Sequence, residues 1–334
     1  MAGIIISEAS AQNNALFGEV QYPIASFLES RFEAAEQESI ASKITRKVKS
    51  THAREGYAGM GSMDDFLPTV ENGEYPHTDM KVAYTKDIVN ITWKNSFSVS
   101  REMLDDSNFK EIFKRAAGMA KRYHSTRENF FMEMLGTALQ GKSEFERNGI
   151  KFDATAYDEL PMFSKSHVGE TKNIKLGNAF SDAFSEEILG ELATRMQNFT
   201  DEKGHVLNIQ PDTILIPNDA DLKRAVFAAI GSEKVTGSGN NDYNYLFGNW
   251  NVLVSPVLNR YIAPGSKPFI LLDSQMIRDE DIFIDQEREA LNVTSLIERN
   301  DANTWNGRCR FGGGFVDFRG MIAGGLDPKF AEEL

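Results

Sequence analysis

Residues 136–143 carry a motif whose residue types and spacing are those of a known chemical site. They read Gly-Thr-Ala-Leu-Gln-Gly-Lys-Ser and match the G-x-x-x-x-G-K-[ST] pattern of a phosphate-binding loop. In a nucleotidase of this kind, Lys142 would contact the phosphates, Ser143 would hold Mg²⁺, and Asp273, after the apolar run 269–272, would be the second metal ligand. Such a loop must follow a strand and open a helix, because the helix N-terminus binds the phosphates.

The sequence before the motif predicts a helix instead of that strand. Apolar residues recur there at helical spacing over about eight turns. A helix is therefore expected over 109–140, with Asn108 as its N-cap and Gly141 as its C-terminal stop, and only Arg127 interrupts its apolar stripe with a charge. The motif then lies at a helix end, where a nucleotide site is not expected, and the nucleotidase is kept as the alternative. The apolar positions are Phe109, Ile112, Phe113, Ala116, Ala117, Ala120, Tyr123, Phe130, Phe131, Met134, Leu135, Ala138 and Leu139.

Other reactive side chains are scattered along the chain. The histidines have no spacing typical of a metal site: His52, His77, His124, His167 and His205. The single cysteine, Cys309, excludes an internal disulfide and is expected to be a small core residue. The sequence therefore predicts no catalytic, cofactor or metal site, and a protein that is not an enzyme.

Composition limits the function further. The chain has 334 residues, 41% of them hydrophobic, which is enough for a substantial core. Its 49 acidic and 36 basic residues give a formal charge of −13, so it gains little affinity from neutralising phosphates, and tight nucleic-acid binding is not expected. The apolar run 4–6 is too short for a signal peptide or a membrane span, which favours a cytosolic protein with no membrane partner.

An unusually long connection marks the first third of the chain. Residues 1–41 form an arm that ends in an amphipathic pattern from 24 to 40. Residues 43–51 and 89–99 then alternate like strands and are predicted to be the two legs of one long hairpin. The glycine- and proline-containing stretch between them, 55–81, is exceptional for a compact domain.

Charge separates the base of this hairpin from its tip. Separate regions of positive and negative charge can fix how two subunits align, so we predict that this loop lies across a neighbouring subunit. The alternative is a solvated loop that contacts no partner. The predicted inter-subunit contacts are the basic Arg46, Lys47, Lys49 and Arg54 and the acidic Asp64, Asp65, Glu71 and Glu74.

The rest of the chain mixes both kinds of element. A helix is predicted from Ser181 or Asp182 to near Gly204, and residues 206–274 are predicted to be an inserted α/β unit with strands at 213–216, 250–254 and 269–272. Strands 291–297 and 305–315 follow, joined by a turn at 301–303. The three glycines 312–314 suggest a bulge or a close backbone approach.

Three passages add to this order of elements. They are 84–106, which ends Ser-Val-Ser-Arg-Glu-Met-Leu-Asp-Asp, 160–167, which ends Phe-Ser-Lys-Ser-His, and 308–320 near the end of the chain. Together with the order of elements, they resemble the major capsid protein of tailed bacteriophages, the Hong Kong 97 fold, and more particularly the Mu-like major head subunit family, with its F-S-x-x-H segment and its closing strand. The resemblance covers nearly the whole chain.

The resemblance implies an α+β capsid fold with a defined set of parts. It implies an N-terminal arm (1–41), an extended loop (42–100), a peripheral domain (101–205 and 275–334) with the spine helix 109–140, and an axial domain (206–274). It also implies pentamers and hexamers of an icosahedral shell in the virion, packaged DNA, a portal, a separate scaffold and decoration proteins, with assembly in the host bacterial cytoplasm. An encapsulin-like compartment is the alternative within the same fold, and the nucleotidase is the alternative outside it.

Overall fold

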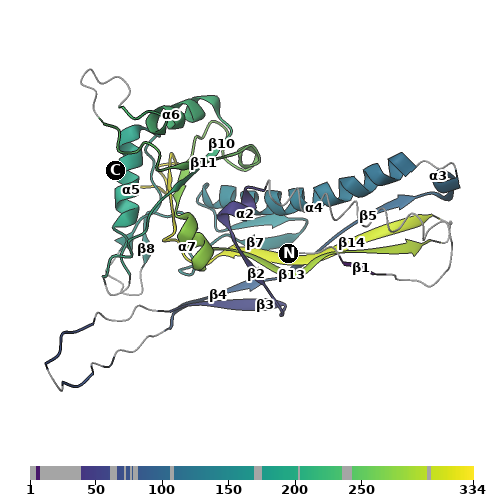
Figure 1. The fold of residues 1–334 in the computed structure, drawn as a ribbon, viewed down its shortest axis with the longest axis horizontal. Helices are drawn as coiled ribbons and strands as arrows, with labels where there is room; N and C mark the ends of the chain where they lie inside the picture. Colours follow the sequence, from purple (N-terminus) through teal and green to yellow (C-terminus); the bar gives the residue numbers. More distant parts are fainter. Residues whose placement is uncertain are drawn as a thin grey trace. The chain divides into compact units, whose positions relative to one another are not determined.

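The chain forms two compact units in a computed structural model. The model describes residues 5–7, 39–60, 66–70, 73–75, 77, 82–105, 109–168, 175–201, 204–234, 243–298 and 302–334. Unit 1 contains Met1–Glu55, Ile88–Met132 and Ile284–Gly313, and unit 2 contains Gly56–Asp87, Glu133–Phe283 and Gly314–Leu334. The mixture of helix and sheet agrees with the predicted α+β class (Figure 1).

Unit 1 is built on a five-stranded sheet in the order β1-β13-β14-β5, with β2 beside β13. β2 runs parallel to β13, and β5 runs antiparallel to β14, with Trp93 opposite Cys309. Two short helices, α2 (Ala41–Ile44) and α3 (Arg101–Asp105), precede β2 and follow β5. The strands are β1 (Ile5–Ser7), β2 (Arg46–Lys49), β5 (Ile91–Val99), β13 (Phe283–Ile297) and β14 (Asn303–Phe315).

The long helix predicted over 109–140 is present as α4 (Phe109–Ala138). In unit 1 its apolar face packs on the sheet, where Phe130 makes edge contacts with Trp93 of β5 and Phe311 of β14. The helix ends two residues before the predicted boundary, because the chain turns into the left-handed region at Gly141, whose φ is 66°. Gly141 is therefore the C-terminal stop that was expected, whereas the predicted N-cap Asn108 lies outside the described residues.

The predicted pairing of 43–51 with 89–99 is wrong. The first leg contains β2, which pairs with β13, and the second leg is β5, which pairs with β14. The hairpin that does form lies inside the predicted one and joins β3 (Arg54–Met60) to β4 (Val82–Val89). The physical reason is the length of the ladder: β5 matches β14 from Val99 to Ile91, far more backbone than the four residues of β2 offer.

The three glycines of β14 mark a close approach, without a break in the strand. A Cβ on Gly312 would lie 2.3 Å from the carbonyl oxygen of Val89, and one on Gly313 would lie 2.4 Å from a ring carbon of Phe131. Of the two predicted outcomes, the structure therefore shows the close approach and no interruption of the strand.

Unit 2 contains a four-stranded sheet in the order β11-β10-β12-β15. β10 is parallel to β11 and antiparallel to β12, and a buried apolar cluster connects this sheet to the helices of the unit. The strands are β10 (Thr213–Pro217), β11 (Asn251–Ser255), β12 (Phe269–Leu272) and β15 (Met321–Gly324), and the helices are α5 (Glu186–Gln197), α6 (Ala220–Ile230), the 3₁₀ turn η1 (Leu258–Arg260) and α7 (Ser274–Asp279). Unit 2 also contains two small antiparallel pairs, β6 (Glu144–Arg147) with β7 (Ile150–Asp153) and β8 (His167–Val168) with β9 (Lys175–Leu176).

Three features of unit 2 differ from the sequence prediction. α5 ends at Gln197, well before the predicted end near Gly204. α5 begins at Glu186, after the predicted start, because the Ser185 hydroxyl accepts a hydrogen bond from the backbone N–H of Ile188 at 3.1 Å and so caps the helix. The backbone N–H groups of Phe180 and Ser181 instead donate to carbonyl groups near the end of the chain. In addition, the sheet that contains the three predicted strands has a fourth, β15, which comes from beyond residue 274.

Candidate inter-subunit site

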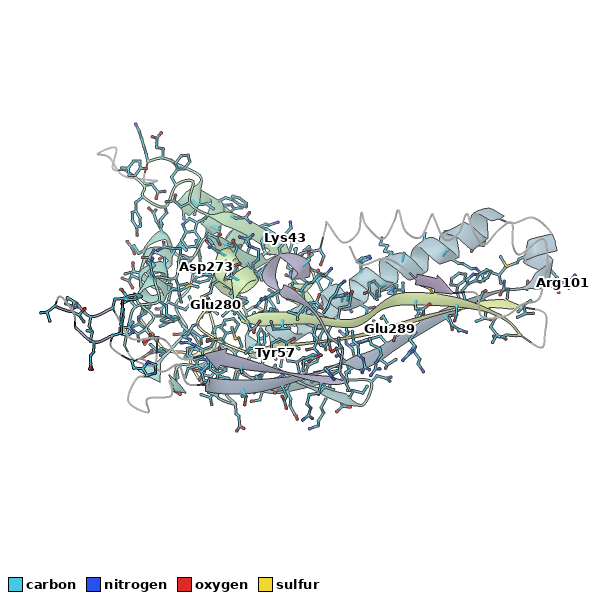
Figure 2. All side chains as sticks on the ribbon, turned by 60° about the horizontal axis from the view of Figure 1, so that its bottom comes forward. Lys43, Tyr57, Arg101, Asp273, Glu280 and Glu289 are labelled. Atoms are coloured by element: carbon cyan, nitrogen blue, oxygen red, sulfur yellow. The ribbon has the colours of Figure 1, made fainter. Side chains whose placement is uncertain are left out.

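The nucleotide-binding alternative fails on local geometry. Gly136 lies within α4, and the segment after the motif is the strand β6 where a phosphate loop requires a helix. The exposed Lys142 donates to Gln140 at 2.8 Å. Asp273, labelled in Figure 2, caps α7 by accepting from two backbone N–H groups at 2.9 Å, and its second oxygen accepts from the Gln210 N–H. Asp273 is a helix cap at the end of a strand.

The predicted contact residues divide between the described and the undescribed parts of the chain. Three of the four cations, Arg46, Lys47 and Lys49, lie together on β2, and Arg54 begins β3. Glu74 is exposed within the described stretch 73–75. Asp64, Asp65 and Glu71 lie outside the described residues. On β2, which pairs with β13, Lys47 and Lys49 share the more exposed face and Arg46 lies on the other.

Sequence reasoning missed the apolar residues of the same loop. Phe66 and Tyr75 are fully exposed, and Leu67 and Val70 are mostly exposed. Large exposed apolar groups in one segment are typical of a contact surface, since aromatic anchors dominate interface energies. The signal that was available was the presence of aromatic residues in a stretch otherwise composed of glycine, proline and charges.

A buried charge cluster lies behind β2 in unit 1. Arg127 of α4 donates from Nη2 to both carboxylate oxygens of Asp285, at 2.6 and 2.5 Å, and from Nη1 to Glu287 and to the Tyr123 hydroxyl. Its guanidinium also lies over the Phe311 ring, 5.1 Å from the centroid. The charge that interrupts the apolar stripe of α4 is thus neutralised by two carboxylates of β13, and this cluster ties the helix to the sheet.

The cluster changes the pKa of its neighbours. Burial raises the pKa of Asp285, and Arg127 opposes that rise. Burial lowers the pKa of Lys47 on β2, and repulsion from Arg127 lowers it further, although both carboxylates act in the opposite direction. Burial also lowers the pKa of His124 to about 4, with Arg127 and Lys47 contributing. Lys47, predicted as a contact residue, is exposed but still within electrostatic range of this cluster.

The surface of unit 2 has one large open groove, of about 840 Å³, along α5. Glu187, Glu191 and Glu332 make it acidic, and the one arginine that lines it, Arg195, lies 3.7 Å from Glu332. This set of side chains contains no nucleophile paired with a base. Within the residues that the structure describes, no group of three or more His, Cys, Asp or Glu side chains is arranged to hold a metal ion.

None of the described helices is both long enough and apolar enough to cross a membrane.

The comparison with protein families decides what this arrangement belongs to. The sequence model of the family described as "Phage capsid protein" matches residues 83–324, well over half of the chain. The chain belongs to the phage capsid protein family. No curated protein matches it. The family match therefore confirms the predictions of a structural shell protein and of a protein that is not an enzyme, and the nucleotidase and encapsulin-like alternatives have no support.

Three solved structures are similar to this chain at low sequence identity. A chain from Microbacterium phage Oxtober96 is 10% identical, with a TM-score of 0.50, and the match covers 86% of this chain and 91% of that one. The procapsid chain of bacteriophage JBD30 is 14% identical, with a TM-score of 0.48 and coverage of 97% and 77%. The virus-like particle of Pyrococcus furiosus is 12% identical, with a TM-score of 0.49 and coverage of 92% and 98%.

At these identities the likeness concerns the fold alone. The predicted Hong Kong 97-type fold is confirmed for this capsid protein, whereas the Mu-like subfamily stays a prediction. As a capsid subunit, the protein associates with further copies of itself to form a shell.

Proposed function

We propose that this capsid protein is the major head subunit, which closes through pentamers and hexamers into an icosahedral shell around phage DNA. The observation that carries the proposal is the group of exposed apolar side chains between β3 and β4, in which Phe66 and Tyr75 are fully exposed in the single chain. Covering such side chains with a second copy removes apolar surface from water, and that is the main gain in protein association.

The charges support the same contact. The basic residues Arg46, Lys47, Lys49 and Arg54 lie on β2 and at the start of β3, and the acidic residues Asp64, Asp65, Glu71 and Glu74 belong to the loop sequence. Opposite signs on two copies would orient the loop of one subunit on the base of the next. These eight residues are proposed as inter-subunit contacts.

The division of the chain follows from the family resemblance. In this proposal 1–41 is the N-terminal arm, 42–100 is the extended loop, 101–205 and 275–334 form the peripheral domain around the spine helix, and 206–274 is the axial domain at the symmetry axes. A separate scaffold, a portal and decoration proteins are the proposed partners. Assembly would take place in the host cytoplasm, and DNA would be enclosed without sequence-specific binding, which agrees with the net charge of −13.

Electron microscopy of the purified protein tests the proposal. The wild type should form rings or closed particles, and particles isolated from infected cells should contain nuclease-protected DNA. A Phe66→Ser/Tyr75→Ser variant should lose at least about tenfold in particle yield with an unchanged Tm, because fully exposed side chains contribute little to stability. Thr69→Ala, in the same loop, is the matched control. A wild type that stays monomeric across concentrations and salts would overturn the proposal.

A further inference from the structure

The β3–β4 hairpin is attached to the rest of unit 2 by an aromatic stack near the end from which its loop leaves the two strands. The ring of Tyr84, on β4, stacks on the ring of Tyr157 with centroids 4.0 Å apart and planes 9° from parallel. On the paired strand β3, Gly59 leaves room for the same ring, since a Cβ there would lie 2.2 Å from a ring carbon of Tyr84. A side chain at residue 59 would therefore push Tyr84 off its platform. Figure 2 marks β3 by its labelled residue Tyr57.

A hydrogen bond adds direction to this stack. The Tyr84 hydroxyl donates to Oδ2 of Asp317 at 3.1 Å. Asp317 is buried and is itself held by Arg319, whose Nε and Nη2 donate to it at distances between 2.5 and 3.0 Å. Because a guanidinium fork binds a carboxylate in one orientation, the acceptor for Tyr84 has a fixed position.

Lys86 makes a second attachment from the same face of β4. Residues two apart on a strand point to one side, and the Lys86 ammonium donates to Asp153 at 2.6 Å, to the Thr155 hydroxyl at 2.7 Å and to the Ala156 carbonyl at 3.3 Å. All three ammonium donors thus have acceptors in the segment just before Tyr157. Two side chains on one strand, held at separate points, restrict rotation as well as displacement.

The platform that receives Tyr84 is rigid. The backbone N–H of Tyr157 donates to the Val316 carbonyl at 2.9 Å. Phe318 stacks on the fully buried ring of His167, with centroids 3.9 Å apart, and the His167 ring nitrogens lie 2.7 Å from Asp158 and 3.2 Å from the Met162 carbonyl. The F-S-x-x-H segment of the sequence thus ends in a histidine that packs on Phe318, next to the residues that contact Tyr84.

We propose that Tyr84 and Lys86 form a lock that sets the direction in which the β3–β4 hairpin projects from unit 2. The end of the hairpin from which the loop with Phe66 and Tyr75 departs is then held in one orientation before a second copy arrives. Preorganisation of this kind lowers the ordering cost of association. Only the benefit to assembly rests on the proposed function, because the lock itself is a property of the single chain.

Distances between two spin labels within unit 2 test the lock directly. Ala58→Cys on β3 and Lys329→Cys near the C-terminus are both at exposed positions, and the native Cys309 is buried. The labelled protein is mixed with an excess of unlabelled protein, so that distances within one chain are recorded. The wild type should give one narrow distance distribution. Tyr84→Leu and Lys86→Met should each widen it at least about twofold, because each removes one of two restraints.

Two further variants separate the parts of the lock. Tyr84→Phe keeps the stack and loses the bond to Asp317, so it should give an intermediate width. Thr85→Ala changes an exposed side chain between the two lock residues and should leave the width unchanged. Unchanged widths in folded Tyr84→Leu and Lys86→Met would overturn the proposal. If Tyr84→Leu does not fold, Lys86→Met and Tyr84→Phe decide the matter by the same criterion.

The yield of particles shows whether the lock acts in assembly, because a residue that only stabilises the fold would change the Tm of the subunit as well. Lys86→Met should reduce the yield of regular particles severalfold while its Tm stays close to that of Thr85→Ala. A wild type without particles would contradict the proposed function, and the distance measurement would still decide on the lock. Normal widths together with normal particles in both lock variants would exclude any role for these residues in aiming the loop.

Discussion

Arg127 on α4 and Asp285 on β13 form a buried, two-pronged ion pair, with Nη2 at 2.6 and 2.5 Å from the carboxylate oxygens. Both side chains are almost fully buried, and Glu287 supplies the second negative charge. Removal of one partner would leave a charge without compensation in the core, which costs far more than the pair contributes as a whole. The pair is therefore a point at which unit 1 is sensitive to single substitutions.

Arg127→Met should lower the free energy of unfolding by about 3–5 kcal/mol, because Asp285 would remain buried without its cation. Arg122→Met removes an exposed arginine from the same helix and should change stability by less than about 0.5 kcal/mol. Denaturant unfolding of the unassembled subunit measures both. Equal effects of the two substitutions would show that the buried pair is not a weak point.

His124 should make stability depend on pH between about 4 and its ordinary value of 6.5. Because burial lowers its pKa in the folded state, the unfolded chain binds the proton more readily in that window. The free energy of unfolding is therefore highest above pH 6.5, where the ring is neutral in both the folded and the unfolded chain, and it decreases as the pH falls toward 4. His124→Gln should show a smaller difference in unfolding free energy between pH 7 and pH 5 than the wild type. An identical difference in both proteins would contradict the assignment.

Gly313→Ala should destabilise unit 1 by about 1–3 kcal/mol, the usual cost of overpacking. The new methyl group would meet the Phe131 ring at 2.4 Å and the Ile284 carbonyl oxygen at 3.0 Å. Gly118→Ala is the matched substitution, since a Cβ there meets nothing within 4 Å on an exposed helical position. It should stabilise the protein by about 0.5–1 kcal/mol through helix propensity. Thermal unfolding of the two variants should move Tm in opposite directions.

Cys309 should resist thiol reagents in the folded subunit. Burial raises the pKa of its thiol to about 12, so the reactive thiolate is scarce at pH 8, and the side chain is also inaccessible. Labelling with a chromogenic disulfide should be slow in buffer and rapid in denaturant. Fast labelling of the native protein would mean that β14 opens without global unfolding.

Local patterns were sufficient for several elements. The helical spacing in 109–140 predicted α4, and the apolar run 269–272 coincides with β12. In both cases the periodicity of neighbouring residues is the cause of the structure, because one face of the helix or the whole strand must be buried. The same local reasoning placed the phosphate-loop motif at the end of a helix, where a nucleotide site was not expected, and the strand β6 after the motif then excluded that site.

Tertiary structure alone decided which segments meet. The alternation of polar and apolar residues marked β2 and β5 as strands, but their partners, β13 and β14, lie about two hundred residues away in the sequence. The alternation within one strand shows which face is buried and does not show which distant strand it pairs with. The charge of Arg127 was visible in the sequence, but its counterions Asp285 and Glu287 were not. The contacts of Tyr84 with Tyr157 and Asp317 likewise arise only after the chain has folded, because they join three separate segments of it.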